Sequence, residues 1–175
     1  MPQVPDKLVL KRHRDLDGIR GADLWARRTV IALLALFAAA GLANVFGQRP
    51  QATVAATPKA TLKLYAPAHL RSGLLFSARF HVFAHRELRR ATLVLDPGWA
   101  EGMAINTIEP GPIGEASKDG KLAFQLGHIR AGSSYILFLQ FQVNPTNVGR
   151  RSQDVELDDG DQPVTRIDRV VTIFP

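Results

Sequence analysis

The chain has 175 residues, a formal net charge of +6 and no cysteine. This length suits one ordinary domain with an additional segment, and the absence of cysteine excludes disulfides, thiolate metal sites, a cysteine nucleophile and the lipid-bearing cysteine of a bacterial lipoprotein. Basic residues alternate with acids instead of clustering on one face with aromatic residues, so we expect no nucleic-acid partner.

Residues 1–28 are polar and of mixed charge, and contain seven lysines or arginines. Gly18 and Gly21 are expected to break any helix before Asp23. The basic residues that we expect to determine membrane topology are Lys11, Arg12, Arg14, Arg20, Arg27 and Arg28.

Residues 29–48 carry no charge and are apolar on every side of a helix. Twenty residues at 1.5 Å each span about 30 Å, the hydrocarbon thickness of a bilayer, so this stretch is predicted to be a transmembrane helix. After it, only Arg49, Lys59 and Lys63 lie close enough to count in the charge balance. The positive-inside rule therefore predicts a single-pass protein of the cell membrane with a cytoplasmic N-terminus and an extracytoplasmic C-terminal domain. A cleaved signal peptide is the alternative, but its basic region and apolar core are usually shorter.

Small residues recur at intervals of four along the apolar stretch, at Ala35, Ala39, Ala43 and Gly47. This spacing allows close packing of transmembrane helices, and Asn44 could add a hydrogen bond to a partner helix. The pattern predicts a membrane-protein partner or a homodimer. Chance spacing in an alanine-rich sequence is the alternative explanation.

Residues 49–60 contain small residues and prolines without periodicity, which predicts a linker. Residues 61–175 contain short alternating runs separated by turn signals and no amphipathic helix, which predicts an antiparallel immunoglobulin-like β-sandwich of about seven to eight strands. The clearest alternation is that of Tyr135, Leu137, Leu139, Phe141 and Val143. Tyr135 is expected to form either a tyrosine corner or an ordinary inward aromatic contact.

Motifs that carry chemistry are few. No nucleophile, P-loop or dinucleotide motif is present, so we expect no enzyme activity, no catalytic residue, no cofactor and no metal site. His81 and His85 would lie about 13 Å apart on a strand, too far to share an ion. The turn at Asp158–Asp161 could offer oxygens to calcium, although positive φ at Asp-Gly also explains it. A carboxylate-pair hydrolase using residues from among Glu101, Glu109 and Glu115 is a lesser alternative.

The sequence around Pro97, Gly98 and Trp99 resembles the CARDB and related bacterial immunoglobulin-like surface modules, in which a strand runs into a Pro-Gly turn with a tryptophan after it. A strand ending in Leu126-Gly127, a loop with Gly132 and a long alternating strand, Tyr135 to Val143, extend this resemblance. The resemblance covers residues 61–175 and implies a fold and a surface-exposed binding or spacer role, without catalytic residues. The chain departs from those families in having one copy of the module.

One loop of the predicted sandwich is a candidate binding loop, with Asn144, Asn147, Arg150 and Arg151. An ordinary polar connection is the alternative. Taken together, the sequence predicts a non-enzymatic accessory or scaffold subunit that binds the bilayer and a membrane-protein partner. A tethered carbohydrate or cell-wall binding module is the second hypothesis; exposed aromatic residues on one face would favour it, and Trp99 is the only tryptophan available.

Overall fold

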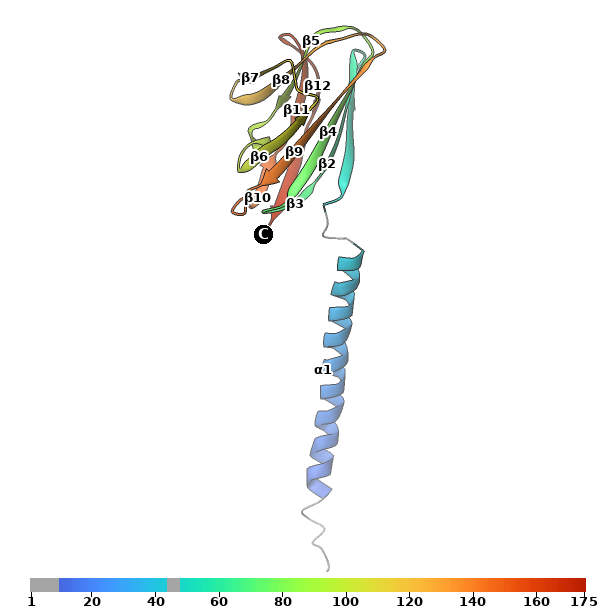
Figure 1. Cartoon of the computed structure of the whole chain (residues 1–175). Coiled ribbons are helices and arrows are strands. Elements are labelled where there is room, and N and C mark those ends of the chain that lie inside the picture. Colours follow the sequence, from blue (N-terminus) through green and yellow to red (C-terminus); the bar gives the residue numbers. More distant parts are fainter. Residues whose placement is uncertain (1–9, 44–47) are drawn as a thin grey trace, which may run out of the picture. The chain divides into compact units, whose positions relative to one another are not determined.

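The computed structural model describes the backbone of residues 10–43 and 48–175, and the side chains of residues 23–43 and 48–175. The chain divides into two compact units, Met1–Phe46 and Gly47–Pro175 (Figure 1). The first contains one helix and the second contains every strand. The predicted fold class, an N-terminal helix followed by an antiparallel β-sandwich, is confirmed.

Helix α1 (Leu10–Leu42) begins earlier than the sequence predicted. Gly18 and Gly21 lie inside it, so the prediction that they break the helix before Asp23 is wrong. A glycine costs about 1 kcal/mol in a helix relative to alanine, which neighbouring helix-forming residues can offset. The helical, apolar stretch that the structure describes is Asp23–Leu42, and residues 44–47 of the predicted span 29–48 lie outside the described residues.

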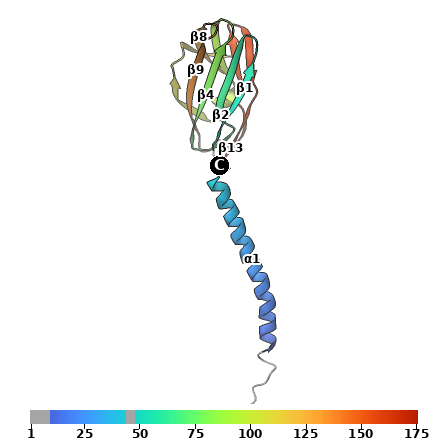
Figure 2. The ribbon, with the colours of Figure 1, turned by 90° about the vertical axis from the view of Figure 1, so that its right-hand side faces the viewer.

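The second unit is a sandwich of two five-stranded sheets with a small three-stranded sheet. The first sheet has the order β1-β2-β4-β9-β6 and the second has the order β12-β11-β5-β8-β7. Figure 2 shows β1, β2, β4 and β9 of the first sheet side by side. The strands are β1 (Pro50–Ala56), β2 (Ala60–Pro67), β3 (His69–Arg71), β4 (Leu75–Ala84), β5 (Leu88–Leu95), β6 (Met103–Glu109), β7 (Gly114–Lys118), β8 (Lys121–Ile129), β9 (Ser134–Val143), β10 (Gly149–Ser152), β11 (Val155–Asp159), β12 (Gln162–Ile167) and β13 (Val170–Phe174). The small sheet has the order β10-β13-β3, and its β13–β3 pair is parallel.

Alternating side chains of the two large sheets form one hydrophobic core. In β9, Leu137, Leu139 and Phe141 are fully buried while the residues between them are not, which confirms the period-two alternation read from the sequence. Phe124 of β8 and Leu157 of β11 are fully buried in the second sheet. The core therefore lies between the sheets, and the outward positions are left for other roles.

Trp99 closes the core at the end of a short 3₁₀ helix, η1 (Pro97–Trp99). Its ring is fully buried, with centroids 5.4 Å from those of Phe80 and Phe141. Its indole Nε1 donates a hydrogen bond to the carbonyl oxygen of Asp154 at 3.3 Å. Gly98 and Trp99 are thus buried while Pro97 is exposed, and Trp99 does not form an exposed aromatic site.

The predicted linker, residues 49–60, is wrong in part. Strand β1 (Pro50–Ala56) occupies most of it and pairs antiparallel with β2 from Pro50↔Pro67 to Ala56↔Thr61. Its small residues lack an apolar alternation because an edge strand contributes little to the core. The structure also has more strands than the seven to eight predicted, since β3, β7 and β10 are too short to give a sequence pattern.

Candidate functional site

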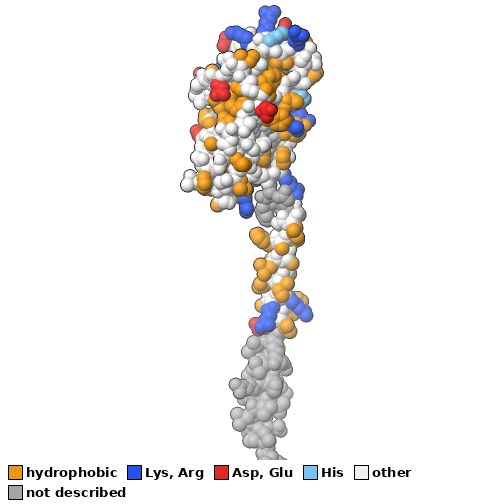
Figure 3. Space-filling model, in the orientation of Figure 1, with side chains coloured by type: hydrophobic (Ala, Val, Ile, Leu, Met, Phe, Trp, Pro, Cys, Tyr) orange, Lys and Arg blue, Asp and Glu red, His pale blue; other side chains and the backbone are white. Residues whose placement is uncertain are grey.

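The apolar part of helix α1 presents hydrophobic side chains on all sides. Within the described residues, Ile31, Leu36 and Phe37 each expose more than 60% of their surface. By length and composition, Asp23–Leu42 is sufficient to cross a membrane. Figure 3 shows these hydrophobic side chains along the helix, with basic side chains at one end of the described part.

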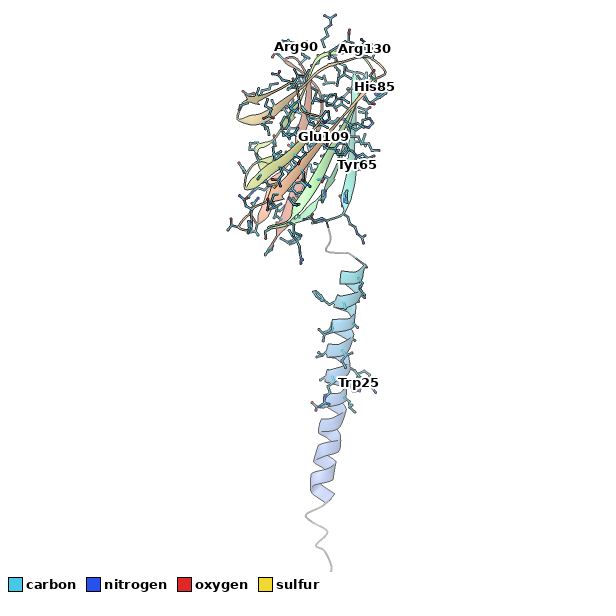
Figure 4. The ribbon with its side chains drawn as sticks, viewed as in Figure 1. Trp25, Tyr65, His85, Arg90, Glu109 and Arg130 are labelled. Atoms are coloured by element: carbon cyan, nitrogen blue, oxygen red, sulfur yellow. The ribbon has the colours of Figure 1, made fainter. Side chains whose placement is uncertain are left out.

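The residues expected to set topology lie in the same helix. Arg27 and Arg28 are exposed, with Arg27 Nη2 3.5 Å from Asp23 Oδ2 and the Arg28 guanidinium 5.9 Å from the centroid of the Trp25 ring. Figure 4 labels Trp25 on this helix. The others, whose side chains are not described, are Lys11, Arg12, Arg14 and Arg20.

The small-residue pattern is partly described. Ala35 and Ala39 are exposed within α1, and Ala43 directly follows the helix and donates its backbone N–H to the Ala39 carbonyl at 2.8 Å. Asn44 and Gly47 lie outside the described residues. Packing of this helix face against a partner stays a prediction.

The candidate binding loop is built around a buried asparagine. Asn147 is only 6% exposed, and its Nδ2 donates to the carbonyl oxygens of Glu101 and Gly102 at 3.1 Å each. Its Oδ1 accepts a hydrogen bond from Arg151 Nη2 at 3.3 Å. These contacts join two connections at one end of the sandwich, so the side chain of Asn147 holds the loop and is not available to a ligand.

The other residues of this candidate loop differ in exposure. Asn144 and Arg150 are exposed and Arg151 is half-buried. Both arginines belong to β10, which pairs with β13, and do not project from an irregular loop as the sequence suggested. A binding role for this region therefore concerns Asn144 and Arg150.

Two carboxylates of the candidate calcium turn form ion pairs with lysines. Asp158 is fully buried and its Oδ2 lies 2.6 Å from Lys118 Nζ. Asp159 Oδ2 lies 2.8 Å from Lys59 Nζ, and its Oδ1 accepts a hydrogen bond from the backbone N–H of Arg90 at 2.9 Å. No group of three His, Cys, Asp or Glu side chains within the described ranges could hold a metal ion. The turn is thus built as a set of ion pairs in the part of the chain that the structure describes.

Two of these residues have shifted pKa values. Burial raises the pKa of Asp159, but hydrogen bonds from Lys59 and from the backbone of Arg90 outweigh burial, and the net pKa is lowered. The hydrogen bond to Asp158 raises the pKa of Lys118. Both shifts favour the charged forms and are typical of structural ion pairs.

The histidines whose side chains the structure describes do not form a site together. His81 lies on β4, while His85 follows that strand and bonds to Thr61 Oγ1 through Nε2 at 2.8 Å. His128 Nε2 lies 2.8 Å from Glu87 Oε1. The sequence placed both residues on one strand, whereas β4 ends at Ala84 and only His81 belongs to it.

The three glutamates of the hydrolase alternative are divided between two places. Glu101 and Glu115 both line an open surface pocket of about 640 Å³ between η1, β7 and β8. Glu109 ends β6 on the first sheet, opposite Phe138 of β9. Of the three glutamates, only Glu101 and Glu115 line the same pocket and can be considered as the carboxylate pair of a hydrolase.

Tyr135 packs against the core and is half-buried, and burial raises the pKa of its hydroxyl. No hydrogen bond from this hydroxyl occurs among the described residues, as a tyrosine corner would require. It is an ordinary inward aromatic residue.

Sequence reasoning missed a surface of aromatic and basic residues on the outer face of the first sheet. Arg79 of β4 has its guanidinium 4.4 Å from the ring centroid of Tyr65 and 5.8 Å from that of Phe138. These three residues are successive cross-strand partners on β2, β4 and β9. Lys63 Nζ lies 4.8 Å from the Tyr65 centroid. Figure 4 labels Tyr65 and Glu109 on this sheet.

The sequence contained one signal for this surface, the outward positions of the alternating strands. Tyr65, Arg79 and Phe138 all occupy such positions. Only the strand order and register show that they are neighbours, because they lie far apart in the sequence.

Within the ranges 10–43 and 48–175, the fold is one long N-terminal helix followed by a β-sandwich. No protein-family model matches the sequence, and no curated protein matches it. Several solved structures are similar in outline. AvmM, which catalyses macrocyclization in alchivemycin A biosynthesis, has 8% identity and a TM-score of 0.40 over 74% of this chain and 90% of its own.

A CARDB domain from Pyrococcus furiosus, solved in complex with di-metal ions, has 14% identity and a TM-score of 0.36 over 73% of this chain and 96% of its own. CaCohA2 from Clostridium acetobutylicum has 9% identity and a TM-score of 0.41 over 73% of this chain and 92% of its own. Values this low transfer neither function nor site residues to this chain.

Proposed function

We propose that the protein is a single-pass membrane protein that presents its sandwich outside the cytoplasm and acts as a non-enzymatic accessory or scaffold subunit. The observation that carries the proposal is the exposed apolar stretch Asp23–Leu42. Side chains such as Leu36 and Phe37 would each lose about 1.5–3 kcal/mol of transfer free energy if they stayed in water. A bilayer removes that cost for every side of the helix together.

The distribution of basic residues supports the orientation. Seven lysines or arginines precede the uncharged residues 29–48, and three follow them within the part of the chain that influences insertion. This difference favours retention of the N-terminus in the cytoplasm. Arg27 and Arg28 lie at the start of the apolar stretch, where their charge would meet the cytoplasmic headgroups.

Two shifted pKa values have explanations within the sandwich. Perturbed pKa values occur at functional sites and in structural ion-pair networks alike, so the contacts of each group are what distinguish the two. Here burial raises the pKa of Asp96, hydrogen bonds from Lys121 and Ser152 outweigh it, and the net pKa is lowered. Burial lowers the pKa of Arg169 to about 10, and this guanidinium lies over the Trp99 ring at 5.6 Å. Asp96 is paired with Lys121 and Ser152, and Arg169 donates a hydrogen bond to the carbonyl oxygen of Pro67, so both groups have structural contacts within the sandwich.

Cysteine labelling in intact cells tests the location, because the chain contains no cysteine. We expect a membrane-impermeant maleimide to label Ser133→Cys, in the exposed turn before β9, without permeabilisation. We expect Gln3→Cys to react only after permeabilisation. The opposite labelling pattern would contradict the orientation. Release of the protein from membranes by alkaline carbonate would contradict the membrane anchor. A mature protein that lacks the N-terminal segment would do the same, because it would indicate a cleaved signal peptide.

A cell-wall or carbohydrate binding module is a second candidate, favoured by one observation. Tyr65, Phe83 and Phe138 all lie at outward positions of the first sheet, and Phe83 and Phe138 expose 36% and 45% of their surface. Flat aromatic faces can stack against sugar rings. Sedimentation with insoluble cell-wall polysaccharide would test this, with Tyr65→Ala and Phe138→Ala expected to reduce binding and Phe174→Ala, on the small sheet, as the control.

A further inference from the structure

The exposed apolar side chains of the sandwich are distributed unequally between its two large sheets. Within the described residues, the strands of the first sheet carry five exposed large hydrophobic residues and those of the second sheet carry none. The five are Val54, Leu75, Phe83, Ile136 and Phe138. A soluble sandwich usually has polar residues on both outer faces, so the outer face of the first sheet is marked as an interaction surface.

Opposite charges lie on either side of Phe138 on this face. Phe138 of β9 pairs with Arg79 of β4 on one side and with Glu109 of β6 on the other. Neighbouring strands are about 4.8 Å apart, so the Cα atoms of Arg79 and Glu109 are displaced from that of Phe138 by similar distances in opposite directions. Arg79 and Glu109 form no ion pair within the described residues.

The guanidinium of Arg79 is also held in place. It lies between the rings of Tyr65 and Phe138, at 4.4 Å and 5.8 Å from their centroids. Stacking of this kind restricts the side chain and leaves its N–H groups free for a carboxylate. A carboxylate partner for Arg79 therefore has to come from outside this copy of the domain.

This arrangement is complementary to itself under a two-fold rotation about an axis parallel to β9 at Phe138. The rotation exchanges the β4 side with the β6 side, so Arg79 of one copy faces Glu109 of the other, twice. Further along the strands, the same rotation places Ser77 opposite Thr107 and Leu75 opposite Ala104, without opposing like charges. Such an exchange of contacts is the requirement of an isologous dimer.

We propose that the partner of this face is a second copy of the same chain, bound with Phe138 and Gln140 at the axis and two Arg79–Glu109 ion pairs on either side. The axis keeps strand direction, so the β1 strands of both copies begin at the same end of the dimer. This is the geometry that two chains anchored in one membrane need. The charge pattern belongs to the sheet alone, whereas the expected strength of the contact rests on the proposed membrane anchor.

The expected affinity follows from the size of the overlap. Strands β4 and β9 have ten residues each and β6 has seven, so the overlap is about 14 Å wide and about 23–33 Å long, roughly 380 Å² per copy. Stable dimers bury about 800 Å² per copy, so this contact is weak for free domains. Confinement of both chains to one membrane would raise their effective concentration and make a weak contact sufficient.

Cross-linking of single cysteines tests the proposal on the full chain in detergent or membranes. Facing sheets lie about 10 Å apart, too far for a disulfide, so a short bis-maleimide is the suitable reagent. We expect Gln140→Cys, at the axis, to give a cross-linked dimer at least fivefold more efficiently than Ser117→Cys, on β7 of the second sheet. Equal yields at the two positions would overturn the proposal.

Charge exchange separates a homodimer from other partners. In the Gln140→Cys background, Arg79→Glu alone and Glu109→Arg alone should each reduce the dimer yield at least fivefold. The double variant should restore it to within twofold, because the ion pairs re-form with reversed sign. Failure of the double variant to recover, with thermal unfolding unchanged, would overturn the proposed interface. If a carbohydrate or a different protein binds this face, no variant should give a cross-linked dimer, and that result would also overturn the proposed homodimer. The cysteine labelling that tests membrane topology would be unaffected by this outcome.

Discussion

Removal of the Trp99 side chain should cost the sandwich most of its stability. The ring is fully buried between Phe80 and Phe141, and large aromatic-to-alanine changes at such positions cost about 3–5 kcal/mol. The lost hydrogen bond to the Asp154 carbonyl adds about 1 kcal/mol. The Arg169 guanidinium over the ring adds about 0.5–2 kcal/mol. Trp99→Ala is therefore expected to lower the free energy of unfolding by about 4.5–8 kcal/mol, against a total of about 5–15 kcal/mol for an ordinary domain.

Urea unfolding measures this loss, followed by far-UV circular dichroism because the substitution removes a fluorescent residue. Trp99→Phe is the matched variant, since it keeps most of the packing and loses the indole N–H. We expect it to cost about 1–2 kcal/mol. A loss below about 2 kcal/mol for Trp99→Ala would refute the reasoning that this residue closes the core.

Three further predictions follow from contacts in the sandwich. Gly98→Ala should destabilise the domain by several kcal/mol, because an added Cβ would lie 1.9 Å from the Ser152 carbonyl oxygen. Gly111→Ala is the control and should be neutral, because an added Cβ there would have nothing within 4 Å. Thermal melts of the two variants test this difference. Asn147→Ala should lower the free energy of unfolding in urea by about 1–3 kcal/mol, because the carbonyls of Glu101 and Gly102 lose their donor. The exposed Asn144→Ala should lower it by less than about 0.5 kcal/mol. Equal effects would contradict the conclusion that the side chain of Asn147 holds the loop. The lowered pKa values of Asp96 and Asp159 contribute stability above the unfolded-state pKa of about 4, and this stability is lost as the pH falls below it. Melting temperatures from pH 7 to pH 3 should therefore fall steeply below about pH 4, and less steeply in Asp159→Asn.

Hydrophobic alternation was sufficient to predict the inner strands of the sandwich. The residues Leu137, Leu139 and Phe141 alternate with outward residues because they face the second sheet. This alternation can be recognised from the local sequence of the strand alone. Strand β1 has no such pattern. It forms because β2 offers unpaired backbone groups along its edge, and backbone pairing does not depend on the side chains of β1.

The same limit applies to the candidate sites. Asparagine is common in turns, so the sequence alone suggests an exposed Asn147. Its burial depends on hydrogen bonds to the backbone of residues 101–102, which are distant in sequence. Arg79, Phe138 and Glu109 become neighbours only through the register of β4, β9 and β6. A single sequence specifies which residues point outward, but the register that places them side by side is a property of the folded sheet.

The difference between the two outer faces bears on whether the sandwich is a spacer or an interaction module. A spacer needs both faces to be polar, because exposed apolar side chains promote association and contribute nothing to the core. On the second sheet no strand residue that the structure describes is a large exposed hydrophobic, although Ile113, just before β7, is exposed over Gly127 of β8. The first sheet instead exposes Phe138 and Ile136 on its strands, beside the charges of Arg79 and Glu109, which form no ion pair within the described residues. Neither the core nor the ion pairs of the sandwich require these four side chains at outward positions. Their presence on one sheet alone therefore favours an interaction role for the domain over a spacer role.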